Sequence, residues 1–385
     1  MRNLLYSTFL WVVALLSVEA QTINLNQNQL QRDFRIAQLM GNLGSDISFT
    51  SRPLDVGKNG ISVNPDFFNL EEYEYTLFSK WDGDLKISVL PLDVTTTFTS
   101  HHPYNRNNGS LIPAKGLQTR ISAGLFAEIG PLSIQFKPEY VTAGNDDFEG
   151  FWEGHYPVIW ARRYNAWNRY DLPEQFGYEN YTKTFLGQSS IRLNWKGMSL
   201  GVSSENIWWG PSIRNSIMMS NQAPGFNHIT FNSTKPIQTP IGAFEWQLVT
   251  GQLEGSGFTP PQPERTYAGT RLYVPKNDDS RYFQGFTLTY SPKYIEGLSI
   301  GFIRWVQTYS EFVEENNDYF PAFDNLFRNN DKYENRNGSL ELERDQAAGI
   351  FMRWLWKDAK AEIYGEFHHN DSKANFRDLL LDSDH

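Results

Sequence analysis

The chain contains no cysteine among its 385 residues. A fold of this size must therefore hold together without disulfides, and Ala20-Gln21 cannot be a lipoprotein processing site. No run of 18 apolar residues follows residue 21, so no transmembrane helix is predicted. Basic residues are outnumbered, 34 against 44 acidic ones, and the net charge is −10. This charge argues against nucleic acid as a partner.

Signals of catalysis and of metal binding are weak. The chain has no His-Glu-x-x-His motif and no phosphate-binding P-loop. Its two histidine pairs, His101-His102 and His368-His369, offer no two-ligand site if they lie on strands, because adjacent strand residues point to opposite faces. We therefore predict no catalytic residue, no cofactor and no metal.

The first twenty residues, MRNLLYSTFLWVVALLSVEA, have the features of a signal peptide. Arg2 supplies the positive start, residues 4–18 form a short apolar region, and Val18-Glu19-Ala20 fits a cleavage site before Gln21. The alternative is an uncleaved anchor helix, for which the apolar run is short. The sequence predicts export after removal of residues 1–20.

From about residue 85 the chain alternates apolar and polar residues with a period of two. In the clearest hairpin, residues 191–195 and 198–203 alternate on either side of a Lys196-Gly197 turn, and Gly130-Pro131 separates another pair of strands. Further strands are predicted at 242–251, 282–290, 297–307, 347–357 and 360–368. This pattern is typical of antiparallel up-and-down β structure.

Three features favour a transmembrane β-barrel over a soluble β-sandwich, which would also alternate. Short turns contrast with long polar segments at 100–116, 144–184, 206–240, 255–279 and 310–344. Aromatic residues gather near the strand ends, and the polar face carries full charges: Arg120, Glu128, Lys137, Arg192, Glu362 and Glu366. A wet lumen tolerates such charges, whereas a sandwich core does not. We expect Leu193 to face lipid and Arg192 the lumen, so that Arg192→Leu would be mild.

Residues 21–80 differ from the rest of the chain. Residues 28–42 place Leu30, Phe34, Ala37 and Leu39 at roughly helical spacing before Gly41. The sequence therefore predicts a helical periplasmic segment at 21–80, followed by a barrel at 81–385 with long loops. A simple surface helix is the alternative for residues 28–42.

Residues 203–257 resemble the capsule assembly protein Wzi family. The resemblance rests on SSENIWWGPSIRNSIMMSNQAPGFNHITF and KPIQTPIGAFEWQLVTGQLEGSG, with support from the upstream NRYDLPEQFG. It implies a large outer-membrane barrel of about eighteen strands with an N-terminal periplasmic helical part. The implied function is non-catalytic binding of exported capsular polysaccharide at the cell surface. Outer-membrane lipid and the barrel-assembly machinery are the other implied partners.

One departure from that family concerns the strand count. About ten to twelve candidate strands can be counted, and the chain stops in the polar segment DSKANFRDLLLDSDH. An open barrel leaves unpaired backbone groups in lipid. We therefore expect the chain to be truncated at its C-terminus.

The Trp-Trp-Gly-Pro stretch is the first candidate glycan site. The rings of Trp208 and Trp209 would stack on a sugar, and Arg214, Asn215 and Asn221 would bind its hydroxyls or carboxylates. The alternative is that both tryptophans pack beneath a loop, which Pro211 also favours because it cannot join a sheet ladder.

A basic and aromatic cluster is the second candidate glycan site. Its members are Arg162, Arg163, Tyr164, Trp167, Arg169 and Tyr170. Arginines among aromatic rings would grip an acidic glycan, or would instead line the barrel against carboxylates. Two other functions stay open at this point: a passive porin or transporter, and a barrel enzyme acting on glycan or lipid.

Overall fold

The computed structural model describes residues 21–57, 60–62, 75–80, 85–276, 279–316, 319–320, 322 and 345–370. The predicted signal peptide, residues 1–20, and the C-terminal polar segment, residues 371–385, lie outside this part of the chain. Both interpretations therefore stay predictions.

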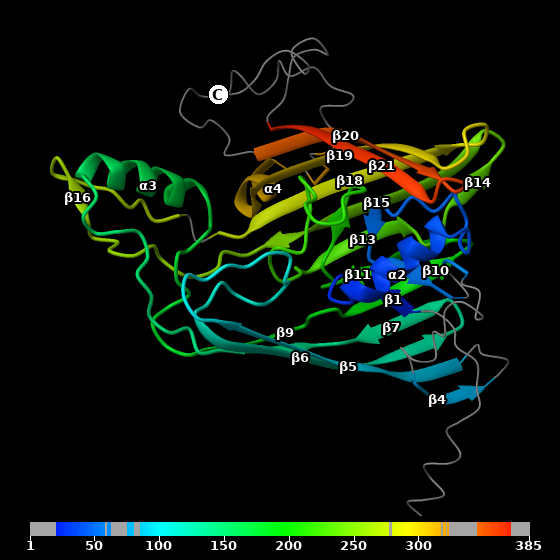
Figure 1. Ribbon diagram of the computed structural model, residues 1–385, viewed down its shortest axis with the longest axis horizontal. Helices are drawn as coiled ribbons and strands as arrows, with labels where there is room; N and C mark the ends of the chain where they lie inside the picture. Colours follow the sequence, from blue (N-terminus) through cyan, green and yellow to red (C-terminus); the bar gives the residue numbers. More distant parts are fainter. Residues whose placement is uncertain are drawn as a thin grey trace, which may run out of the picture.

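One large antiparallel sheet dominates the molecule, and its strands follow each other in sequence order (Figure 1). The main path consists of β4 (Tyr75–Lys80), β5 (Leu85–Thr99), β6 (Gly116–Ile129), β7 (Leu132–Phe136), β10 (Ser190–Trp195), β11 (Met198–Ser203), β13 (His228–Ser233), β15 (Gly242–Leu253), β18 (Arg281–Pro292), β19 (Leu298–Tyr309), β20 (Asp345–Trp356) and β21 (Ala361–Asn370). This arrangement confirms the predicted up-and-down β structure.

Three shorter strands continue members of the main path. β8 (Glu139–Ala143) pairs with β6 beyond β7, and β9 (Tyr181–Phe185) pairs with β8. β14 (Ile237–Thr239) continues β13 along β15. The twelve strands of the main path agree with the ten to twelve counted in the sequence. Within the described residues, β4 and β21 are the two ends of the main path.

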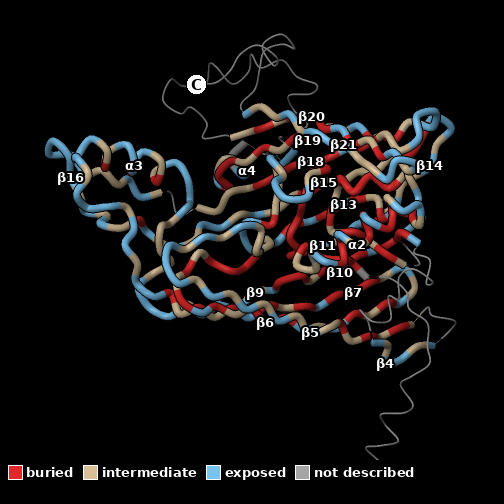
Figure 2. Tube along the Cα trace, viewed as in Figure 1, coloured by how far each residue is buried: buried red, intermediate tan, exposed pale blue. Residues whose placement is uncertain are grey.

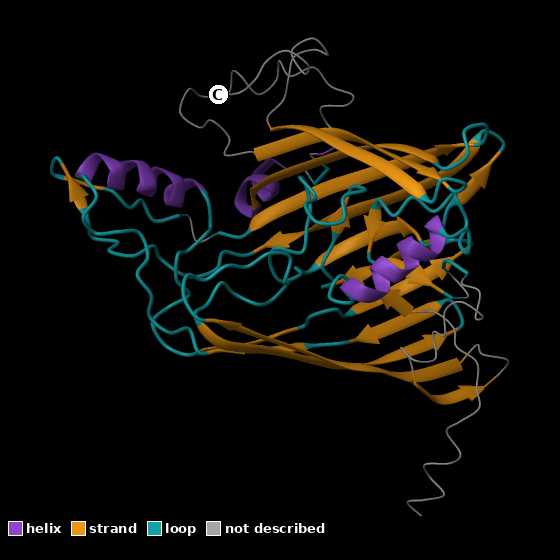
Figure 3. Ribbon diagram, in the orientation of Figure 1, coloured by secondary structure: helices purple, strands orange, loops and turns teal. Residues whose placement is uncertain are grey.

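The turns have the asymmetry expected from the sequence. Lys196 and Gly197 both adopt positive φ, 48° and 83°, and they join β10 to β11 with Trp195 opposite Met198. Positive φ at both central residues gives the turn the twist that matches the flanking strands. Gly130-Pro131 likewise joins β6 to β7. The longer connections gather at the opposite end of the sheet, where α3 (Pro157–Arg169) lies (Figure 3).

The two faces of the sheet have inverted polarity. Leu193 on the outer face is 52% exposed, whereas the neighbouring Arg192 on the inner face is 3% exposed. The same alternation of exposed apolar and buried polar side chains runs through β6 and β13, and Figure 2 shows the alternation along the strands. A water-soluble sandwich would bury its apolar face, so this polarity fits a sheet whose outer face meets lipid.

The N-terminal segment packs on the inner, concave face of the sheet (Figure 1). It consists of β1 (Gln21–Ile23), α2 (Asn28–Leu39), β2 (Ser51–Arg52) and β3 (Leu54–Val56). It has a small apolar core of its own, which includes Leu30 and Phe34 of α2. Arg35 Nε of α2 lies 2.7 Å from Glu362 Oε1 of β21. The helix predicted at 28–42 is confirmed, whereas the compartment of residues 21–80 stays a prediction.

Several segments that the sequence assigned to irregular loops are ordered. The 144–184 segment contains α3, and 206–240 contains β13, which belongs to the wall. Beyond β19 lies α4 (Ser310–Asn316), and β16 (Thr266–Tyr267) forms a small hairpin with β17 (Thr270–Arg271). Among the described residues, no helix is long and apolar enough to cross a membrane.

We predict that Leu193→Arg will impair insertion by about 2–4 kcal/mol, the cost of a cationic side chain near the midplane of the lipid-facing surface. Tyr178→Arg, at a loop position that is 73% exposed, serves as the control. Folding into lipid vesicles, followed by heat-modifiability on gels, measures the inserted fraction. Equal insertion of both variants would show that the outer face does not meet lipid.

Candidate functional site

The two tryptophans of the Trp-Trp-Gly-Pro stretch are buried inside the molecule. Trp208 and Trp209 form β12, which pairs with β2 of the N-terminal segment. Trp209 is 0% exposed and its Nε1 donates a hydrogen bond to Gln247 Oε1 at 2.7 Å. Trp208 is 3% exposed and lies under Arg52, 4.6 Å from the ring centroid. Neither ring is available to stack on a sugar, so the predicted platform is wrong for these two residues and the loop-packing alternative holds.

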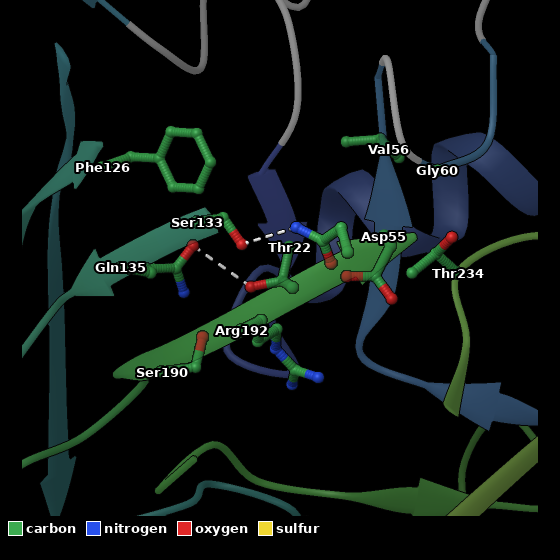
Figure 4. A pocket seen from close by; sticks show the side chains of 11 residues that line it. Thr22, Asp55, Val56, Gly60, Phe126, Ser133, Gln135, Ser190, Arg192 and Thr234 are labelled. Carbon is green, nitrogen blue, oxygen red and sulfur yellow. Dashed lines mark hydrogen bonds between the residues drawn. The ribbon is translucent and has the colours of Figure 1, made fainter. Parts of the chain in front are cut away.

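The residue that opens this motif, Glu205, binds the barrel wall. Its carboxylate accepts a hydrogen bond from Arg192 Nη2 at 2.6 Å and another from Thr22 Oγ1 at 2.5 Å. Gln135 Oε1 lies 3.1 Å from the same hydroxyl (Figure 4). Burial alone would raise the pKa of Glu205, but Arg192 and the hydrogen bonds outweigh it and lower the pKa. Glu205 therefore stays ionised as the partner of a buried arginine.

The Gly-Pro step joins the same loop to β21. Gly210 has φ +106°, a backbone conformation that favours glycine, and a Cβ there would lie 2.4 Å from Glu366 Oε1 and displace that carboxylate. Glu366 in turn accepts hydrogen bonds from the backbone N–H groups of Ser212 and Ile217. Pro211 O accepts one from Arg35 of α2 at 2.6 Å. The motif thus links the N-terminal segment, the loop and the wall.

The other predicted residues of this stretch lie farther out on the loop, where it meets residues 100–115. Asn221 is buried and donates to Asn107 O at 3.2 Å. Arg214 and Asn215 are exposed. Asn215 Oδ1 accepts from Arg106 Nη2 at 2.5 Å, and Arg214 O accepts from Asn107 Nδ2 at 2.5 Å. The structure therefore separates the predicted set into buried anchors and an exposed outer part.

The second predicted cluster lies on and just after α3, in a lobe at the far end of the sheet (Figure 1). Tyr164 and Trp167 are buried with Trp160 in the core of this lobe. The Tyr164 hydroxyl lies within hydrogen-bond distance of the carbonyls of Pro261 and Gln262, and burial raises its pKa. These aromatic side chains are therefore packing residues, which corrects their predicted role in the site.

The remaining members of that cluster stay accessible. Arg162, Arg163 and Arg169 are exposed, and Tyr170 is 60% exposed. Arg163 already lies over the rings of Phe151 and Trp167, at 5.3 and 4.8 Å from their centroids. The accessible guanidinium groups and the exposed tyrosine could contact a glycan. Arg162, Arg163 and Arg169 therefore do not line the inside of the barrel against carboxylates.

Two short strings of the chain match the Gly-x-Ser-x-Gly pattern of serine hydrolases, at 197–201 and 297–301. Their serines, Ser199 and Ser299, lie within β11 and β19 and are buried. A nucleophile elbow requires a strand-to-helix turn, so neither string is one. Across the described ranges, no group of three or more His, Asp or Glu side chains could hold a metal ion. His101 and His102 share a bend rather than a strand, and their Nδ1 atoms are 2.7 Å apart.

Comparisons with known proteins agree with this architecture. The family model for the capsule assembly protein Wzi matches residues 94–379. This chain belongs to that family. A solved structure of the Escherichia coli outer-membrane protein Wzi, described as a carbohydrate-binding β-barrel involved in group 1 capsule assembly, matches with a TM-score of 0.50. The two chains are 11% identical, and the match covers 93% of this chain and 65% of the other. No curated protein matches this chain.

This Wzi-family chain therefore spans less than two thirds of the length of the solved structure, and at 11% identity the likeness concerns the fold alone. Within the described residues, sequence reasoning missed the partners of the motif: Arg52, Gln247 and Arg106. All three come from segments far away in the chain. No local pattern pairs them with the loop, although the Gly-Pro step does signal close packing.

We predict that Arg192→Leu will lower the free energy of unfolding by about 3–5 kcal/mol, because it leaves the buried Glu205 charge without its partner. This reverses the expectation from sequence that the change would be mild. Adding Glu205→Gln to Arg192→Leu removes the stranded charge and should recover part of the loss. Denaturant titration of the folded protein in detergent measures both. A loss below about 1 kcal/mol for Arg192→Leu alone would contradict the pairing.

We also predict that the N-terminal segment docks more firmly in acid. Burial raises the pKa of Asp55 in β3 from 3.8 to about 6, against the opposing pull of Arg192. Between those two values the docked carboxyl keeps a proton that the released segment loses, so docking weakens as pH rises through about 6. Hydrogen-exchange protection factors of β1 and β3, measured from pH 4.5 to 7.5, test this. Asp55→Asn should flatten the profile, and an unchanged profile would refute the assignment.

Proposed function

We propose that this protein binds exported polysaccharide at the cell outer membrane and holds it there as a non-catalytic component of capsule assembly. The match of the Wzi family model over residues 94–379 carries the proposal. The inverted polarity of the sheet supports a place in the membrane, because its exposed apolar outer face needs lipid. The related Escherichia coli protein, a carbohydrate-binding barrel, supports the ligand class.

We place the binding surface on the exposed residues at the long-loop end of the sheet. The candidates are Arg162, Arg163, Arg169 and Tyr170 in the α3 lobe, and Arg214 and Asn215 in the loop after β11. Guanidinium groups suit carboxylates and hydroxyls, and an exposed tyrosine can stack on a sugar ring. Insertion of such a sheet also implies an encounter with the barrel-assembly machinery.

No observation favours a porin within the described part of the molecule. The N-terminal segment and the loop at 206–227 occupy the concave side of the sheet and bond to several strands. Two cavities there, both lined by Asp55 and Arg192, have volumes of about 30 and 20 Å³. Cavities of this size have room for water molecules. Figure 4 shows the first of them.

We predict that cells lacking this protein will shed polysaccharide into the medium and that the intact gene will restore retention. Combined replacement of Arg162, Arg163 and Arg169 by Gln should increase shedding several-fold in a folded protein, because many weak contacts act together on a repeating chain. Cell-bound and free polysaccharide are measured beside heat-modifiability. Full retention by cells without the protein would refute the proposed function.

A further inference from the structure

Two loops that meet at the long-loop end contain no acidic residue. Residues 100–115 and 206–227, here named the acid-free loop pair, have neither Asp nor Glu, although about one residue in nine of the whole chain is acidic. Glu205, immediately before the second loop, is buried with Arg192. The pair is therefore an exception in a chain whose net charge is −10.

A ladder of hydrogen bonds holds the two loops together. Gln222 Nε2 donates to Asn105 O at 2.9 Å and its Oε1 accepts from Asn107 N at 3.0 Å. Gly109 N donates to Asn221 O at 2.9 Å. With the bonds of Arg214 and Asn215 described above, backbone groups and side-chain amides make most of this seam. The seam fixes the positions of the side chains that project from it.

Two exposed guanidinium groups project from the seam, and neither pairs with a carboxylate within the described part of the chain. Arg106 is exposed and donates to the amide oxygen of Asn215. Arg214, the residue before Asn215, is also exposed. A neutral amide orients a guanidinium but does not neutralise it. Tyr104, 71% exposed, lies on the same loop.

The carboxylates that reach the acid-free loop pair accept hydrogen bonds from groups other than these arginines. Glu139, 1% exposed, accepts from Ser110, and Glu366 accepts from Ser212 and Ile217 beneath the second loop. At the edge of the pair, Lys115 meets Asp146 only through a backbone β-bridge, and its Nζ donates to the carbonyl oxygen of Asp147. In the α3 lobe, by contrast, Arg271 pairs with Glu264 at 2.8 Å and Lys276 with Asp171 at 3.7 Å.

We infer that the acid-free loop pair is the subsite that recognises the acidic groups of the polysaccharide. Arg106 and Arg214 bind its carboxylates, and Tyr104 offers a ring to the neighbouring sugar. The inference rests on the proposed function and names the substrate class as an anionic glycan. It assigns the charge recognition to this seam rather than to the α3 lobe, where Arg271 and Lys276 pair with carboxylates and Arg163 lies over two aromatic rings.

The test uses the full chain folded in detergent and the purified surface polysaccharide of the cells that make it. One portion of the polysaccharide is left native, and in another the carboxylates are reduced to alcohols, so that chain length and linkage stay the same. Binding is measured at 50 and 500 mM salt. Arg106→Gln/Arg214→Gln is compared with Arg106→Lys/Arg214→Lys, which keeps the charges, and with the control Arg271→Gln.

We expect the wild-type protein to bind the native polysaccharide about tenfold more tightly than the reduced one at low salt, and less so at high salt because exposed charges are screened. The double Gln variant should lose this preference while keeping its heat-modifiability. The double Lys variant should keep most of the preference, and Arg271→Gln should keep all of it.

Other outcomes separate the two proposals. Equal binding of native and reduced polysaccharide by the wild-type protein overturns the inference and leaves the proposed function intact. Loss of the preference in Arg162→Gln/Arg169→Gln, with the preference kept in Arg106→Gln/Arg214→Gln, also overturns the inference and leaves the proposed function intact. If the double Gln variant fails to fold, the two single variants Arg106→Gln and Arg214→Gln decide the question: a reduced preference supports the inference, and full retention of the preference in both overturns it. No binding of either polysaccharide by the folded wild-type protein refutes the proposed function itself.

Discussion

The structure depends on the pairing of charges that the sheet buries on its concave side. A sheet that gives its apolar face to lipid must turn its polar face inward, where an unpaired charge is costly. The N-terminal segment and the loop after β11 supply the partners. Arg192 meets Glu205, Arg35 meets Glu362, and Arg353 donates to the carbonyls of Ile47 and Ser48. The sheet, the N-terminal segment and the loop after β11 therefore form one folding unit.

This constraint explains the residues that identify the family. Contacts with the wall and with the N-terminal segment engage all four of them: Glu205, Trp208, Trp209 and Gly210. A sugar platform and a packed junction both need large aromatic rings beside polar groups, so composition alone cannot tell them apart. The distinction lies in whether the rings are covered, and the covering segment comes from residues 51–52, far away in the sequence.

The strands were predictable because period-two alternation and tight turns are local signals, and α2 followed from apolar residues at helical spacing. The helix α3 was missed, although Trp160, Tyr164 and Trp167 recur at i, i+4 and i+7 and Pro157 begins the helix. We interpreted Tyr164 and Trp167, with their neighbouring arginines, as a ligand-binding cluster. Arg52, Gln247 and Arg106 could not be found from sequence, because only the folded chain brings them to their partners.

The loop at 206–227 has an inner half that anchors it to the sheet and an outer half that is exposed. Its inner half is tied to β2 and β21, so it behaves as part of the wall rather than as a free loop. Its outer half continues directly from this anchor and joins the loop at 100–115 through amide groups. Under the proposed function, a glycan bound at Arg214 would contact a loop that is already ordered, so binding would cost little ordering entropy. Under the proposed function, substitutions in the inner half would reduce polysaccharide retention by releasing the outer half. Folding and binding must therefore be measured on the same variants.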